Sequence, residues 1–261
     1  MLSLSIGLLT FLTAIWVSTF AMASGGEGAI IFVPFFLMLG VDLNAAIATA
    51  FITQAFGKSS GTIGWLVKKD EAGKPFIQWN IVILLLAAGL PFLVIGSYFS
   101  YVIKSSVLQF LFGLSIIVLA GLMVYSFKTH RSEWDSIATK DFRGLSLVIA
   151  AVAGLVTGIF SIGAGTLNLM LLEMHHKLKI INSAATVVAV MAITALVGTL
   201  FHASQGIRLD IAMFTIPGVL IGAWVGSWFA CSLKDKGWIK VLFIALTMVV
   251  GITMVLTSGL F

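Results

Sequence analysis

The sequence predicts an all-α, polytopic membrane protein: a helix bundle built from two inverted repeats, with eight long spans and two short helices interrupted by glycine. Of the 261 residues, 60% are hydrophobic and 10% are charged, whereas soluble domains carry roughly 25% charged residues. Apolar stretches of about 20 residues, which can cross roughly 30 Å of hydrocarbon, recur along the whole chain. The sequence also matches itself at a fixed offset, which indicates a duplication.

Charge and cysteine content exclude two other classes of protein. The net charge of +5 comes from Lys and Arg residues between the apolar stretches. Basic residues at such positions set the orientation of membrane spans, so we expect a lipid bilayer as partner and no nucleic acid. A single cysteine, Cys231, excludes a disulfide framework and a paired-cysteine redox site.

Two halves of the chain are related by an offset of 137 positions, which aligns residues 25–65 with 162–202 without a gap. An offset of 126 then pairs Pro91 with Pro217 and Gly96 with Gly222. We therefore predict a first repeat at 1–127, a polar cytoplasmic linker at 128–142 and a second repeat at 143–261. The matches at the first offset are Gly26/Gly163, Gly28/Gly165, Ala48/Ala185, Thr49/Thr186, Ala55/Ala192, Gly61/Gly198 and Thr62/Thr199.

Each repeat contains a long span, a glycine cluster, a short apolar segment and three more long spans. A length near 20 residues identifies each long span. Unusually short, glycine-interrupted segments at matching positions of two repeats indicate a secondary transporter. The predicted segments are 2–22, 28–40, 43–67, 76–102 and 106–127, then 144–160, 164–174, 180–203, 209–232 and 238–260.

The distribution of basic residues favours one of two topologies for the short segments. If they cross the membrane, Lys104 and Arg208 stand alone on one side and the other twelve flanking basic residues collect opposite them. If they return to the side they came from, the division is eight against six. Because cytoplasmic loops carry the excess of Lys and Arg, we predict crossing segments, oppositely inserted halves and both termini outside the cell (inner or plasma) membrane.

The glycine clusters are candidate anion sites. Gly25, Gly26 and Gly28 precede one short segment; Ser161, Gly163 and Gly165 precede the other. Glycine lets a ligand approach the backbone, and the free N–H groups and dipole at a helix start favour an anion. The alternative is that these glycines only allow close helix packing.

Polar residues inside the apolar segments are further candidates for binding. Lys58 lies in the middle of a span, where an ionisable group is a functional-site hypothesis; its alternatives are an ion pair with Glu27 or a side chain that snorkels. Gln54 lies one helical turn earlier, on the same face. Glu27, the carboxylate within a glycine cluster, is a candidate for coupling transport to an ion, and a coupling ion, proton or sodium, is left open.

The repeated threonines and Asn168 complete the set of candidate substrate-binding residues. Thr49 and Thr186 occupy equivalent positions, where a hydroxyl donates to an oxyanion or, alternatively, bonds back to its own helix. Asn168, like Gln205 and His202, is a weaker candidate. The adjacent His175 and His176 point in different directions on a helix, so we expect no metal site there.

The glycine clusters and the motifs that follow them resemble those of a known family. The run from Gly154 to Gly165, followed by Ala185-Thr186 and Gly198-Thr199, is similar to the repeat signature of the TauE/SafE family of sulfite and organosulfonate exporters. Its counterpart is Gly25-Gly26-Glu27-Gly28, with Val33-Pro34 and Ala48-Thr49. The resemblance implies a permease for small sulfur-containing anions such as sulfite or sulfoacetate. Glu27 stands where that family usually keeps a small residue.

These observations predict a secondary transporter that works by alternating access and uses no cofactor. A membrane-embedded enzyme is the first alternative, but it needs a convergent set of titratable groups, and the spans offer only Lys58 and Glu27 as strong candidates. An anion channel or a partner subunit is the second alternative. Whether the protein forms a homodimer is left open.

Overall fold

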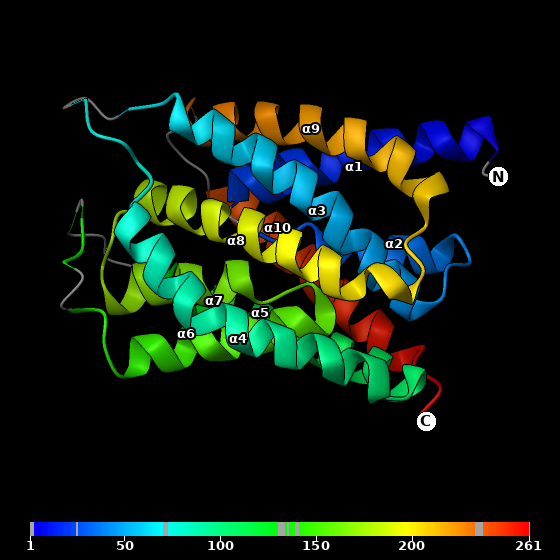
Figure 1. Ribbon diagram of the computed structural model, residues 1–261. Helices are drawn as coiled ribbons and strands as arrows, with labels where there is room; N and C mark the ends of the chain where they lie inside the picture. The colour runs from blue at the N-terminus through cyan, green and yellow to red at the C-terminus, as the bar shows by residue number, and fades with distance from the viewer. Residues whose placement is uncertain are drawn as a thin grey trace.

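The computed structural model describes residues 3–24, 26–69, 73–129, 134, 136–138, 141–232 and 237–260, and this part of the chain contains helices and no β-strand (Figure 1). The prediction of an all-helical, polytopic bundle is confirmed. Part of the predicted linker 128–142 lies outside the described residues. The helices are α1 (Leu4–Ser24), α2 (Ala29–Met38), α3 (Leu43–Leu66), α4 (Trp79–Val102), α5 (Ser105–Thr129), α6 (Leu145–Phe160), α7 (Ala164–Met170), α8 (Ile180–His202), α9 (Leu209–Ser232) and α10 (Gly237–Leu256), with a π-helical turn at Leu171–His175 and a 3₁₀ turn at Ala203–Gln205.

Five of these helices are long and apolar enough to cross a membrane by length and composition alone: α1, α4, α5, α8 and α9. Helix α3 is equally long, with 24 residues, but it carries Lys58 and other polar side chains. Helix α6 has 16 residues and α2 has 10, so neither reaches the length of a full span. Among the five long apolar helices, α8 is the most buried, and it packs on α3, most of whose residues are buried as well.

The helix contacts reflect the two predicted repeats. Where a helix of one repeat packs on a helix of the other, the equivalent helices of the two repeats make the reciprocal contact. Helix α1 packs along α9, and its counterpart α6 packs along α4. Helix α3 packs on α8 and α5 on α10, while the short helices α2 and α7 lie on α3 and α8. Such a pattern is what two repeats related by a twofold axis produce. The residue boundaries of the repeats stay a prediction.

Glycine makes both of the long helix pairs possible. A Cβ at Gly96 of α4 would collide with the carbonyl oxygen of Leu155 in α6, and a Cβ at Gly222 of α9 would collide with that of Ile15 in α1. Gly96 and Gly222 are repeat partners in the sequence. Small residues let helix backbones approach closely in membranes, where packing is the main attraction between helices.

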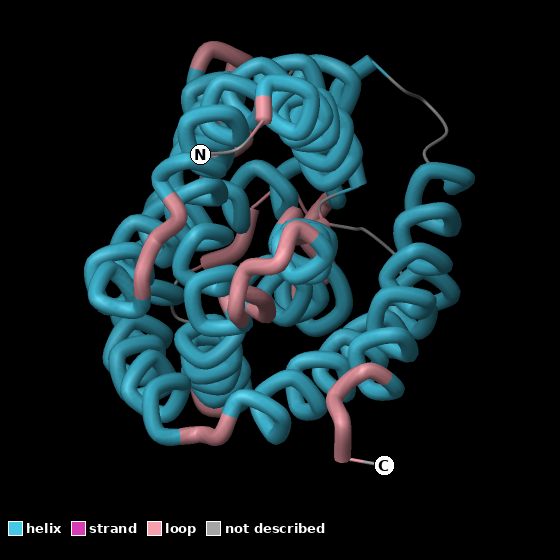
Figure 2. Tube along the Cα trace, turned by 90° about the vertical axis from the view of Figure 1, so that its right-hand side faces the viewer, coloured by secondary structure: helices cyan, strands magenta, loops and turns pink. Residues whose placement is uncertain are grey.

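The ends of the helices fall into two groups. In Figure 1, α1 begins at the right-hand end of the bundle, and α2, α4, α8 and α10 end there; α3, α7 and α9 end at the left. Figure 2 views the bundle from the end at which both termini lie. The first helices of the two repeats, α1 and α6, begin at opposite ends (Figure 1), as opposite insertion requires.

The basic residues follow the same division. Lys104 and Arg208 lie in the loops after α4 and α8, at the end that holds the termini. The loops at the other end carry Lys68, Lys69, Lys74, Arg143, Lys177 and Lys179 among the described residues. This arrangement agrees with the topology in which the short segments count as crossings. Which end faces the outside stays a prediction.

Candidate functional site

Two buried interruptions of the helices lie in the bundle interior, one after α1 and one after α6. The first break contains Gly26, Glu27 and Gly28, all buried, and Gly25 lies outside the described residues. The second break contains Ser161, Ile162 and Gly163 before α7 begins at Ala164. The backbone of Gly163 has φ of 118°, a conformation that essentially only glycine adopts without strain.

The carboxylate of Glu27 crosses from the first break to the second. Its Oε2 accepts a hydrogen bond from the backbone N–H of Gly163 (2.6 Å), and its Oε1 accepts from Thr166 N–H (2.9 Å) and from Gly165 N–H. Its side chain is buried, with 1% of the residue exposed. Bonds from N–H groups to a charged acceptor are stronger than neutral ones, and a negative charge at the start of α7 also complements the helix dipole.

Lys58 is buried beside the first break and does not snorkel to either surface. Its residue exposure is 4%, and its Nζ donates to the carbonyl oxygen of Gly26 at 3.1 Å. The ammonium is attracted to the carboxylate of Glu27. Within the described residues, no ion-pair contact within 4.0 Å joins the two groups, so the direct partner of Lys58 is a backbone oxygen of the break.

Gln54 connects α3 to the second break. It lies four residues before Lys58, and its Nε2 donates to the carbonyl oxygen (2.8 Å) and the hydroxyl (3.0 Å) of Ser161. The Oε1 of Gln54 has no hydrogen-bond partner among the described residues. One face of α3 therefore reaches the first break through Lys58 and the second break through Gln54.

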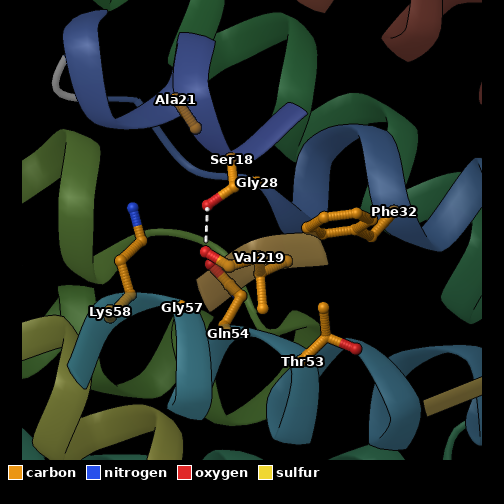
Figure 3. Close-up of a pocket in the computed structure, with 9 residues that line it drawn as sticks. All are labelled: Ser18, Ala21, Gly28, Phe32, Thr53, Gln54, Gly57, Lys58 and Val219. Atoms are coloured by element: carbon orange, nitrogen blue, oxygen red, sulfur yellow. Dashed lines mark hydrogen bonds between the residues drawn. The ribbon is translucent and has the colours of Figure 1, made fainter. Parts of the chain in front are cut away.

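Two small cavities flank this cluster, and Gln54 lines both. Figure 3 shows the first, in which Lys58 and Gln54 rise from α3 toward Ser18 of α1. Each cavity has a volume of about 10 Å³, room for roughly one water molecule. The first is lined by Ser18, Ala21, Gly28, Phe32, Thr53, Gln54, Gly57, Lys58 and Val219; the second is lined by Glu27, Phe51, Gln54, Thr157, Ser161, Ala164, Met191, Thr194 and Ala195.

The other predicted binding residues lie away from these cavities. Thr49 Oγ1 accepts from the N–H of Arg208 at 3.0 Å, directly before α9, and donates to its own helix at Ala45 O. Its repeat partner Thr186 accepts from the N–H of Gln78 at 3.1 Å, directly before α4. The two hydroxyls thus hold equivalent helix starts. Asn168 is buried, with 3% exposed, and lines neither cavity.

Several polar residues at the site carry no signal in the sequence. Ser18 and Thr53 line the Lys58 cavity, and Thr157 Oγ1 accepts from the N–H of Ala164 at the start of α7 (2.7 Å). Single hydroxyls on apolar helices usually bond back to their own helix, so periodicity alone does not distinguish these. Within the described residues, no group of three or more His, Cys, Asp or Glu side chains is placed to hold a metal ion.

The histidines considered from the sequence lie outside the site. The Nε2 of His202 is 2.8 Å from the carbonyl oxygen of Gly158, which joins the end of α8 to α6. His176 follows the π-helical turn; its Nε2 is 2.9 Å from Ser146 Oγ, and its ring stacks on Phe142. Burial lowers the pKa of His176 below its ordinary value, and the neighbouring His175 lowers it further.

Comparisons with known proteins place this arrangement in a family. The model of the family described as sulfite exporter TauE/SafE matches residues 10–254. The chain is 26% identical, over 227 residues, to the probable membrane transporter protein YjnA of Bacillus subtilis (strain 168), covering 81% of this chain and 87% of that protein. No solved structure matches the chain significantly. The family match spans nearly the whole bundle, including both helix breaks, so the chain is a membrane transporter that belongs to the TauE/SafE sulfite exporter family.

Proposed function

We propose that the protein is a secondary transporter for small sulfur-containing anions such as sulfite or organosulfonates of the sulfoacetate type. The anion binds near the middle of the membrane, between the two helix breaks, and the protein exposes it alternately to each side. The observation that carries the proposal is the buried ammonium of Lys58 at the first break.

An anion at this position would complete the hydrogen bonding of Lys58. An ammonium group has three donors, and one hydrogen bond from Nζ, to Gly26 O, is described. The carboxylate of Glu27 already accepts three backbone N–H bonds at the other break. A charged side chain inside a membrane is costly without a partner, so a substrate anion beside Lys58 gains both charge neutralisation and donors.

The size of the cavities supports a carrier and not an open pore. Each has room for about one water molecule, whereas sulfite has four heavy atoms. The site must therefore widen to admit a substrate, as a carrier does when it opens to one side. Interrupted helices at matching repeat positions are the usual location of the substrate in such transporters.

The proposed orientation in the membrane follows the sequence prediction. We propose that the end of the bundle that carries Lys104 and Arg208 faces outward, with both termini, and that the more basic end faces the cytoplasm. Labelling of single cysteines introduced near each end by an impermeant reagent on intact cells tests this orientation. Reaction of the more basic end and protection of the termini would contradict it.

The first test of the substrate is thermal stabilisation of the purified protein in detergent. A ligand at one hundred times its dissociation constant stabilises the folded state by about 2.7 kcal/mol. We expect sulfite or sulfoacetate, but not chloride or sulfate, to raise the melting temperature of the wild type. Lys58→Gln should abolish the rise, while Lys104→Gln, which removes a basic residue far from the site, should keep it.

Transport then requires flux measurements in proteoliposomes. Uptake of labelled sulfite should saturate with concentration, and a proton or sodium gradient that accelerates uptake would identify the coupling ion. A conductance that does not saturate would instead indicate a channel. The assignment of the site fails if Lys58→Gln responds to sulfite as the wild type does, and the substrate class fails if no sulfur anion stabilises or is taken up.

A further inference from the structure

The ionisable and amide-bearing residues that line the two cavities all come from the first repeat. The offset of 137 positions pairs Glu27 with Ala164, Gln54 with Met191 and Lys58 with Ala195. Each ionisable or amide-bearing side chain thus has an apolar partner in the second repeat. The duplication supplied two equivalent positions for every group, and only one of each pair is polar.

The two cavities follow the same pairing. Gln54, Gly57 and Lys58 of α3 line the first cavity, and their partners Met191, Thr194 and Ala195 of α8 line the second. The α3 wall of the first cavity and the α8 wall of the second are therefore equivalent parts of the two repeats. The first cavity is lined by the ammonium group of Lys58 from α3. The residues that α8 contributes to the second cavity are apolar except for Thr194.

A carboxylate of the protein itself occupies the second break. Glu27 bonds to the N–H groups of Gly163, Gly165 and Thr166, and two of these residues, Gly163 and Gly165, belong to the cluster that the sequence suggested for a substrate anion. At the first break the corresponding neighbour is the ammonium of Lys58, which bonds to Gly26 O. Among the described residues, Glu27 is the only carboxylate that lines either cavity.

We propose that Glu27 is a tethered anion that fills the second break permanently, so that each chain binds one substrate anion, on the Lys58 side. A carboxylate held by three backbone donors is a fixed occupant and not a mobile carrier of the coupling ion. It also opposes a second anion, because two negative charges would then share one buried site. The position of the substrate rests on the proposed function, whereas the tethered anion rests only on the hydrogen bonds of Glu27.

Chemical rescue tests the tethered anion without any transport measurement. Glu27→Ala removes four heavy atoms, the two side-chain carbons and two oxygens that acetate would replace. We expect Glu27→Ala to melt several degrees below the wild type, and acetate to restore most of the loss relative to chloride at equal ionic strength. Formate should restore less and propionate least, while the wild type should respond to none of them.

Gln54→Met is the matched control, because it removes two hydrogen bonds to the same break and introduces the side chain of its own repeat partner. Its loss of stability should not be recovered by acetate, since Glu27 still fills the site. If Glu27→Ala does not yield folded protein, Glu27→Gln and Glu27→Asp replace it: Asp, which keeps the charge, should melt above Gln. Equal effects of acetate on Glu27→Ala, Gln54→Met and the wild type would overturn the proposal, as would a Gln variant that melts above the Asp variant.

The number of bound anions is measured separately by calorimetry with sulfite. The wild type should bind one sulfite per chain, and Glu27→Ala in acetate-free buffer should bind two. Two sites in the wild type would overturn the proposal. If the wild type binds no sulfite but acetate still rescues Glu27→Ala, the tethered anion stands and the proposed substrate is wrong.

Discussion

Gly165→Ala is the substitution that most directly probes the contact between the two repeats. A Cβ at position 165 would lie 2.7 Å from both Cγ and Oε1 of Glu27 and 2.8 Å from Sδ of Met191. Ordinary van der Waals contact begins near 3.4 Å, so the carboxylate must retreat by about 0.7 Å. The side chain of Met191 is flexible and can adapt, whereas the carboxylate of Glu27 is held by three backbone N–H bonds.

The size of the effect follows from the hydrogen bonds. A retreat of about 0.7 Å lengthens the 2.9 Å bond from Thr166 N–H to Glu27 to about 3.6 Å, which is no longer a hydrogen bond. The bond from Gly165 N–H, the shorter of the two, lengthens but stays within hydrogen-bonding distance. At about 1.5–3 kcal/mol for the lost bond to a charged group, and after roughly 1 kcal/mol gained from helix propensity, the net loss is about 0.5–2 kcal/mol.

The assay is the melting temperature of purified protein in detergent, followed by tryptophan fluorescence. At roughly 2–4 °C per kcal/mol for a chain near this size, Gly165→Ala should melt about 1–8 °C below the wild type. Gly121→Ala is the control, because a Cβ there, in the interior of α5, meets nothing within 4 Å. It should melt at or slightly above the wild-type temperature.

A double-mutant cycle identifies the cause. In the Glu27→Ala background the added methyl group no longer displaces a carboxylate, so Gly165→Ala should become neutral or slightly stabilising through helix propensity, since residues in contact are not additive. If the penalty is the same in both backgrounds, the collision with Glu27 is not its source and the reasoning is refuted.

Three further predictions concern the surroundings of the site. Thr49→Val and Thr186→Val should each cost about 1–2 kcal/mol, because each leaves a helix-start N–H without its acceptor; calorimetry should show unchanged sulfite affinity, and a weakened affinity would return these residues to the binding site. Gly158→Ala should cost at least about 2 kcal/mol, because its Cβ would lie 2.8 Å from Ser97 N in α4; size-exclusion chromatography should show loss of folded protein, and a normal profile would contradict the close packing. His176→Gln should remove a fall of the melting temperature as pH drops below about 6.5, the unfolded pKa, because the lowered folded pKa of His176 makes its stabilisation full above that value and lost as pH falls through the folded pKa; an identical pH profile in the variant would exclude it as the source.

Much of the fold follows from the sequence because a membrane leaves few choices. Each apolar stretch long enough to span forms a helix, since backbone groups must bond within the segment. The convergence of Gln54 and Lys58 also follows, because residues four apart share a helix face. The alignment of 25–65 with 162–202 pairs Thr49 with Thr186, and in the structure both hydroxyls accept from the N–H directly before a helix.

The parts that sequence reasoning missed involve backbone partners. Glu27 bonds to N–H groups more than 130 positions away, and a backbone N–H has no residue type that could reveal it. The hydroxyls of Thr49 and Thr186 were predicted either to donate to an oxyanion or to bond back to their own helix. Thr49 does bond back, to Ala45 O, and both hydroxyls also accept from the main chain, which no sequence pattern indicated. A polar residue repeated at equivalent positions indicates that both positions require a hydrogen-bonding group. Only the fold shows whether its partner is a ligand or the chain itself.

The pairing of α1 with α9 and of α4 with α6 has a consequence for biosynthesis. Ser18 and Thr19 of α1 donate to the carbonyl oxygens of Val219 and Gly222 in α9, so α1 enters the bilayer about two hundred residues before its partner is made. Helix α4 is likewise synthesised before its partner α6. Each of these two tightly packed helix pairs therefore contains one helix from each half of the chain, so neither half can complete its packing alone. An isolated fragment 1–127 should insert but stay loosely packed and prone to degradation, and co-expression with 143–261 should rescue it.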